Sequence, residues 1–223
     1  MYFQVHPLRE LITQGEGLTL DFKKTISSAR KIAKTLSAFA NTKGGRLLIG
    51  VNDNGKVTGT RTGDELYMIQ SAANVFCDPK VPFEWTEHEY KGKLVLEIYI
   101  PESQQKPHLA KDKEGRWWAY HRVDDETLTA SIVMLNLMRR EMNGIPTQFT
   151  YSEPEQQLLQ YIQNHGAINI KQATKELKIK RKKVIAMLVD LLAVGVLNVY
   201  TSSSKEVYDL NPIHEAQVVS AIR

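Results

Sequence analysis

The chain has 223 residues, of which 42% are hydrophobic, and 29 Lys or Arg against 25 Asp or Glu give a net charge of +4. This apolar content is enough for packed cores and excludes a disordered chain. The single cysteine, Cys77, excludes an intramolecular disulfide, and no apolar run approaches the about 20 residues that a membrane-spanning helix needs. Because the N-terminus also lacks a signal-peptide pattern, we expect a cytoplasmic protein with no membrane partner.

Residues 1–145 have the periodicities of an α+β domain with a mixed, mostly antiparallel sheet and flanking helices. Helical spacing predicts helices over residues 28–40, 63–77 and 129–142. Alternating or continuous apolar runs predict strands over residues 18–22, 46–51, 56–60, 81–90 and 93–100, and a hairpin over residues 107–123. Tight turns at Asn54-Gly55 and Lys91-Gly92 join successive strands, so these strands should pair antiparallel.

A domain boundary is predicted at residue 145, where the sequence Asn-Gly-Ile-Pro at 143–146 interrupts the helical pattern. Residues 146–223 then form a second, smaller domain. A capping-box spacing from Ser152 to Glu155 starts the first of three helices, which are predicted over residues 152–164, 171–177 and 180–194. Two short strands follow at residues 196–200 and 205–210. This order is typical of a small winged helix-turn-helix domain.

Positive charge in the second domain is concentrated in one segment. Residues 171–183 contain seven of its nine Lys or Arg and one acid, Glu176. These seven are Lys171, Lys175, Lys178, Lys180, Arg181, Lys182 and Lys183. Residues 180–183 would occupy the first turn of the third helix, from which groove-reading side chains project in helix-turn-helix proteins. The segment indicates a nucleic-acid-binding surface, and a solvated helix face is the alternative.

Five segments of the first domain resemble, in order and spacing, the Schlafen AlbA_2 family. They are GEGLTLDFKK, LSAFANTKGG, RLLIGVNDNGKVTGT, KPHLAKDKEG and WAYHRV, and the resemblance extends over about residues 8–140. It implies an AlbA_2, or Schlafen-core-like, α+β fold. Bacterial members commonly carry a C-terminal winged helix and are usually described as DNA-binding proteins or transcriptional regulators.

The resemblance also implies a possible catalytic and metal-binding site. Some animal relatives cleave tRNA and rRNA with three carboxylates, which fall here on Glu16, Asp21 and Asp53. Such a trio would hold Mg²⁺ or Mn²⁺ for metal-dependent cleavage. The family strand usually reads EFK, so Asp21 supplies a side chain one methylene shorter. The structural alternative places Asp53 in a turn and pairs Asp21 with a neighbouring lysine.

Basic residues at family-matching positions form a second candidate surface for nucleic acid. They are Lys23, Lys24, Lys43 and Arg122, and Gly44-Gly45 beside them would let a backbone approach a phosphate. The alternative is a tight helix-to-strand turn with solvated lysines. Residues 41–50 contain no GxxxxGK[ST] motif, so no nucleotide cofactor is expected.

Taken together, these patterns favour a DNA-binding transcriptional regulator that docks on duplex DNA through its winged helix. A metal-dependent endoribonuclease acting on structured RNA is the alternative, and a winged-helix adaptor that binds protein is a third possibility. Cys77 is expected to be a packed core thiol. The apolar stripe of Ile132, Leu135, Met138 and Met142 suggests a homodimer in which two copies pair about a twofold axis.

Overall fold

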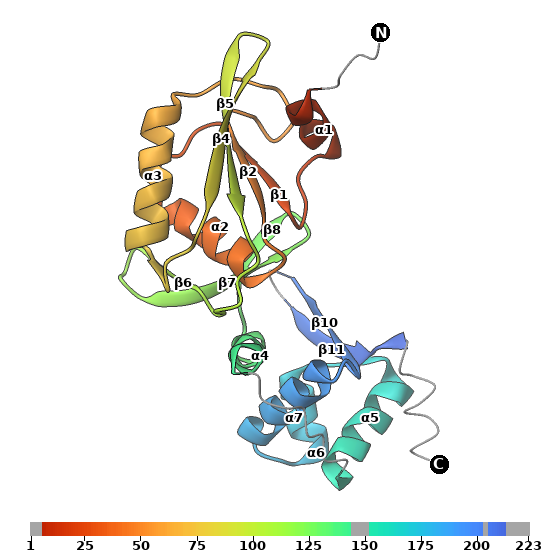
Figure 1. The fold of residues 1–223 in the computed structure, drawn as a ribbon. Helices are drawn as coiled ribbons and strands as arrows, with labels where there is room; N and C mark the ends of the chain where they lie inside the picture. The colour runs from red at the N-terminus through yellow and green to blue at the C-terminus, as the bar shows by residue number, and fades with distance from the viewer. Residues whose placement is uncertain (1–5, 144–151, 203–204, 213–223) are drawn as a thin grey trace. The chain divides into compact units, whose positions relative to one another are not determined.

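A computed structural model describes residues 6–143, 152–202 and 205–212 of the chain, which forms two compact units, 1–130 and 131–223 (Figure 1). In the sequence, unit 1 ends at Ala130, which is fifteen residues before the boundary expected at residue 145. The difference is helix α4 (Ile132–Met142), which packs on α7 (Arg181–Ala193) within the second unit. Val133 is fully buried in the core of that unit, so α4 is part of its packing.

The main sheet of unit 1 is mixed. Its order is β1 (Leu20–Lys23), β2 (Gly45–Ile49), β5 (Lys93–Ile100) and β4 (Glu84–Tyr90). Strands β1 and β2 are parallel, whereas β5 pairs antiparallel with both β2 and β4. The expected mixed, mostly antiparallel α+β architecture is confirmed.

Helices cover both faces of this sheet (Figure 1). Helices α2 (Ala29–Asn41) and α3 (Thr62–Val75) share one apolar core with Leu47 and Ile98 of the sheet. On the other face, Leu8 of helix α1 (Pro7–Gln14) joins a smaller core. The sheet is therefore buried on both sides for much of its length.

A second, antiparallel sheet packs on α2. It contains β3 (Cys77–Asp78), β6 (Leu109–Lys111), β7 (Trp117–Val123) and β8 (Glu126–Thr129) in that order. Helix α2 contacts both β6 and β7 while its other side packs on the main sheet. Cys77 lies in the shared core with 4% of its surface exposed, as expected for a packed thiol, and burial raises its pKa to about 12.

The described residues of unit 2 form four helices and a small sheet. After α4 come α5 (Glu153–His165), β9 (Ala167–Ile168), α6 (Ile170–Leu177), α7, β10 (Leu197–Thr201) and β11 (Glu206–Leu210). Its three strands are antiparallel in the order β10, β11, β9. Leu158, Leu188 and Tyr208 are fully buried in the core that joins helices and sheet.

Two expectations about local structure differ from the fold. The strand predicted over residues 56–60 is reduced to a single bridge between Val51 and Val57. Thr58 and Gly59 still donate backbone hydrogen bonds to Gly50 O, so the chain turns back as predicted but does not form a ladder. In the stripe along α4, Met138 is buried while Ile132 and Met142 are 40% and 50% exposed, so the stripe is only partly exposed.

Candidate nucleic-acid interface

The seven cations of residues 171–183 lie on α6, on α7 and on the short connection between them. Local signals fix both helices in place. A capping box between Asn169 and Gln172 starts α6, because each side chain bonds the other residue's backbone N–H. Lys178 ends α6 in the left-handed conformation with φ 53°, and Lys180 precedes α7 as its N-cap residue.

All seven cationic side chains are exposed, and they form no ion pair within 4.0 Å with an acid of the described residues. Lys171, Lys175 and Arg181 line one hollow of about 420 Å³ together with Ile170 and Thr174. Lys171 and Lys175 are four residues apart on α6 and therefore lie on the same side of it. These three cations are thus gathered around a concave surface that an anionic group can enter.

The start of α7 adds to the positive potential at this hollow. Backbone N–H groups in the first turn of a helix lack partners within the helix and carry the positive end of its dipole. Arg181 is the first residue of α7, and its cap residue Lys180 makes no side-chain hydrogen bond to the helix start. A phosphate near Arg181 would meet both side-chain and backbone donors.

In unit 1, Glu16 and Asp21 lie side by side, as the resemblance implied. Glu16 Oε1 accepts a hydrogen bond of 2.8 Å from Phe22 N. Burial raises the pKa of Glu16 above its usual value; the bond from Phe22 N opposes this shift, and the Asp21 carboxylate adds to it. Asp21 is buried, and its two oxygens lie 2.9 Å from Lys23 Nζ and 3.6 Å from Arg122 Nη1.

The third carboxylate of the proposed trio, Asp53, is exposed in the turn after β2, where Gly55 N donates to Asn52 O at 2.8 Å. Throughout residues 6–143, 152–202 and 205–212, no three or more Asp, Glu, His or Cys side chains gather in a way that could hold a metal ion. The residues present do not fit a three-carboxylate Mg²⁺ or Mn²⁺ site. Asp21 pairs instead with Lys23, as the structural alternative predicted.

Arg122 is not a surface cation, and its expected phosphate contact is wrong. Its side chain is 1% exposed. Arg122 Nη2 donates to Gly17 O at 2.6 Å, and Nη1 donates to Thr127 Oγ1 at 3.2 Å. The guanidinium also lies over the Phe39 ring, 4.9 Å from its centre. These contacts and the nearby Asp21 hold Arg122 inside unit 1, where phosphate cannot reach it.

Gly44 and Gly45 serve internal packing rather than an approach to phosphate. A Cβ on Gly44, which has φ +66°, would lie 2.6 Å from Glu102 N. One on Gly45 would lie 2.5 Å from the Phe39 ring. Both positions therefore need glycine because other parts of unit 1 occupy the space. Lys24 and Lys43 beside this region are exposed, and Lys23 is 39% exposed although it pairs with Asp21.

Asn41 at the end of α2 is a buried polar residue of unit 1 that was not among the expected site residues. Asn41 is 4% exposed. Its Nδ2 donates to His108 O at 2.8 Å and to Tyr120 O at 2.9 Å, and its Oδ1 accepts from His108 N at 2.7 Å. One side chain thus ties α2 to β7 and to the segment before β6. Two signals in the sequence could have indicated it: the amide stands at the end of an otherwise apolar helix face, and it lies within the segment LSAFANTKGG that carries the family resemblance.

Unit 1 is an α+β domain of two sheets around a central helix, and unit 2 is a helical domain with a small sheet and a cationic surface. The chain belongs to the Schlafen AlbA_2 family, which it matches over residues 16–131. This membership supports nucleic-acid binding. No curated protein matches the chain.

Two solved structures are similar to this chain. The DIP2311 protein from Corynebacterium diphtheriae is 18% identical with a TM-score of 0.45; the match covers 81% of this chain and 33% of that protein. The N-terminal domain of a RecG-related protein from Nitrosomonas europaea is 21% identical, with a TM-score of 0.41. That match covers 57% of this chain and 95% of that domain. This chain therefore spans about a third of the length of the first protein.

Among the described residues, no helix is long and apolar enough to cross a membrane.

Proposed function

We propose that the protein is a DNA-binding transcriptional regulator whose unit 2 is a winged helix that docks on duplex DNA. The observation that carries this proposal is the group of seven exposed cations on α6 and α7, none of which is paired with an acid of the described residues. Cations left without acidic partners around a concave surface favour a polyanion, because phosphates release bound counterions when they are neutralised.

The order of elements in unit 2 supports the winged-helix assignment. Helices α5, α6 and α7 are followed by the hairpin of β10 and β11, and the short strand β9 between α5 and α6 pairs with β11. In such a domain the third helix enters the major groove and its N-terminal residues contact the DNA. Here that helix is α7, which begins with Arg181, Lys182 and Lys183.

The test is a salt titration of the full chain on duplex DNA, followed by fluorescence anisotropy. With about six phosphate contacts, the affinity should fall about 10³-fold between 50 and 200 mM salt. The variant Lys171→Glu, Lys175→Glu, Arg181→Glu removes the three cations around the hollow. It should weaken binding by at least about 10²-fold and make the salt dependence shallower by about three phosphate contacts.

A control with the same change in charge separates the site from general electrostatics. Lys31, Lys80 and Lys113 are exposed in unit 1, and changing all three to Glu alters the net charge equally. This control should keep most of the affinity. Unit 2 should stay folded in the first variant, because Glu at positions 171 and 181 lies in the first turn of a helix, where acids are favourable. Equal losses in the two variants would refute the assignment of the site to α6 and α7.

A metal-dependent endoribonuclease is the less favoured function, because Asp53 does not gather with Glu16 and Asp21 in a group that could hold a metal ion. We derive no catalytic step from these residues. Incubation of structured RNA with Mn²⁺ tests the preference, and cleavage that Asp53→Ala abolishes would reverse it. A flat salt response on both DNA and RNA would instead favour a protein-binding adaptor.

A further inference from the structure

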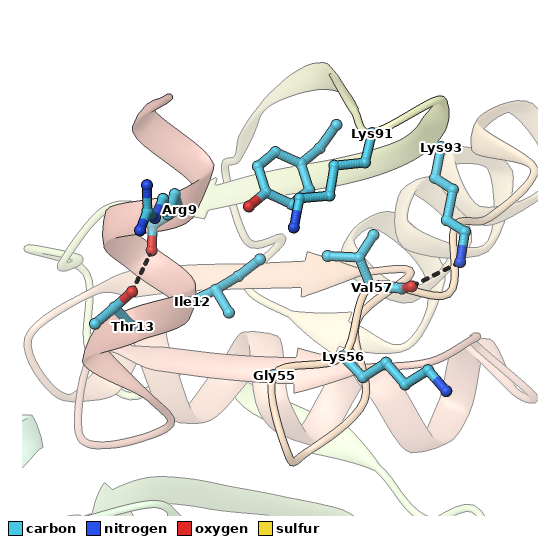
Figure 2. Close-up of a pocket in the computed structure, with 9 residues that line it drawn as sticks. Arg9, Ile12, Thr13, Gly55, Lys56, Val57, Lys91 and Lys93 are labelled. Atoms are coloured by element: carbon cyan, nitrogen blue, oxygen red, sulfur yellow. Dashed lines mark hydrogen bonds between the residues drawn. The ribbon is translucent and has the colours of Figure 1, made fainter. Parts of the chain in front are cut away.

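A second concentration of positive charge without acidic partners lies in unit 1, and none of its cations is a site residue implied by the family resemblance. A hollow of about 400 Å³ is enclosed by α1, by the turn after β2 and by the hairpin of β4 and β5 (Figure 2). Its charged lining consists of Arg9, Lys56, Lys91 and Lys93, and none of the described residues that line it is an acid. Ile12, Val57 and Tyr90 add apolar surface.

The four cations are not neutralised by the protein. All four residues are exposed, and none forms an ion pair within 4.0 Å with an acid of the ranges that the structure describes. Lys93 Nζ donates to Val57 O at 2.9 Å, and Lys91 Nζ lies 5.2 Å from the centre of the Tyr90 ring. Figure 2 shows Lys91 reaching across the hollow toward Arg9, while Lys56 extends away from α1. Their mutual repulsion is relieved when an anion binds among them.

Two tight turns with positive φ form walls of this hollow. Lys91 has φ 53° in the two-residue turn between β4 and β5, where Asn or Gly is the usual residue. Gly55 has φ +77°, and a Cβ there would lie 3.1 Å from Ile12 Cγ2 of α1. The turn after β2 is thus pressed against α1. This turn places Lys91 at the rim of the hollow.

We propose that this hollow binds the phosphate group of a small organic phosphate, about the size of a mononucleotide. Its volume lies within the range of small-molecule sites, and it combines apolar walls with charged groups, as such sites do. Arg9 can bind a phosphate through two parallel N–H donors, and Lys91 supplies a mobile point charge opposite it. The site is independent of the α6 and α7 surface and of the proposed DNA binding.

Two kinds of molecule could provide such a phosphate group: a free nucleotide and the 5′ end of a nucleic-acid strand. Both present a phosphate monoester next to a sugar and a base, so the lining alone recognises either. An internal phosphodiester carries one charge less, so four cations attract it less strongly than they attract a terminal phosphate. The experiment therefore compares AMP with matched strands that differ only in the 5′ group.

The test is a titration of the full chain followed by the amide signals of Gly55, Lys56 and Gly92 in two-dimensional NMR. The probes are AMP, adenosine, and a short single strand with a 5′-phosphate or a 5′-hydroxyl. The variant Arg9→Glu, Lys91→Glu removes the two facing cations. It should keep its fold, because Arg9 lies in the first turn of α1 and both side chains are exposed. The control Lys31→Glu, Lys80→Glu changes the charge equally on other exposed positions.

AMP should shift the three amides and adenosine should not, and the variant should bind AMP at least about tenfold more weakly while the control is unchanged. Shifts with the 5′-phosphorylated strand alone would assign the site to strand ends instead of free nucleotides. The proposal is overturned if neither phosphorylated probe shifts these amides, or if the variant binds AMP as tightly as the parent and the control. Duplex binding through Lys171, Lys175 and Arg181 is measured separately, so either proposal can fail without the other.

Discussion

Replacing Asn41 with Ala tests whether one buried amide holds the layers of unit 1 together. The substitution removes the bonds of 2.8 and 2.9 Å that Nδ2 donates to His108 O and Tyr120 O, and the bond accepted from His108 N; a further bond from Nδ2 to Ser37 Oγ is 3.4 Å long and adds little. His108 O keeps a partner, because Ser37 Oγ donates to it at 2.8 Å. His108 N is left buried without its partner, which costs about 1–3 kcal/mol, and each remaining bond contributes about 1 kcal/mol. The free energy of unfolding of unit 1 should therefore fall by about 3–5 kcal/mol.

Urea denaturation followed by tryptophan fluorescence measures this loss, because all three tryptophans of the chain, at positions 85, 117 and 118, lie in unit 1. Asn74→Ala is the matched control. Asn74 is exposed on α3, and its Nδ2 donates to Gln70 O at 2.9 Å within the same helix. Its replacement should cost no more than about 0.5 kcal/mol, as is usual on the surface. If the two variants differ by less than about 1 kcal/mol, the assigned role of Asn41 is wrong.

Three further predictions concern unit 1. Gly44→Ala should cost more than about 2 kcal/mol in unfolding free energy, whereas Gly92→Ala, with φ +70° but open space around it, should cost only about 1 kcal/mol. Cys77 should resist a thiol reagent at neutral pH, because burial raises its pKa to about 12, and it should react once urea unfolds unit 1. Fast labelling of the native chain would contradict this prediction. Since the pKa of Glu16 is raised from 4.5, its favourable contribution is present at acidic pH and is lost as pH rises through the folded pKa. Glu16→Gln should thus become more stable relative to the parent as pH rises from about 4 to 7, and a constant difference would refute the assignment.

Elements set by local signals were predicted well from the sequence. Helix α2 follows the expected range 28–40 within one residue, because Ser28 caps it and its apolar positions recur at helical spacing. Helices α6 and α7 also fall where they were expected, since Asn169 and Lys178 mark the ends of α6. Helix α1 was missed, because it has eight residues and Leu8 alone is fully buried.

Features that depend on distant partners were not predictable in the same way. Arg122 alternates with apolar residues in a strand, and nothing near it in sequence indicates that it is buried. Its hydrogen-bond partner Gly17 is 105 residues away, and Asp21 is similarly remote. The hollow beside Arg9 also depends on residues that are far apart in the sequence. Its cations come from α1, from the turn after β2 and from the β4–β5 hairpin. Each of these cations looks like an ordinary surface residue within its own segment.

The positions that carry the family resemblance in unit 1 therefore have a physical explanation that does not require catalysis. Asp21 on β1 and Arg122 on β7 are both buried, and Lys23 completes the neutralisation of the Asp21 carboxylate. A buried charge that loses its partner is strongly destabilising, so neither member can change alone without loss of stability. Asn41, Gly44 and Gly45 are constrained in the same way by the backbone groups and ring packed against them. Exposed cations have no such constraint, and for this reason the function of this chain is better sought in its unpaired surface charge than in its most recognisable motifs.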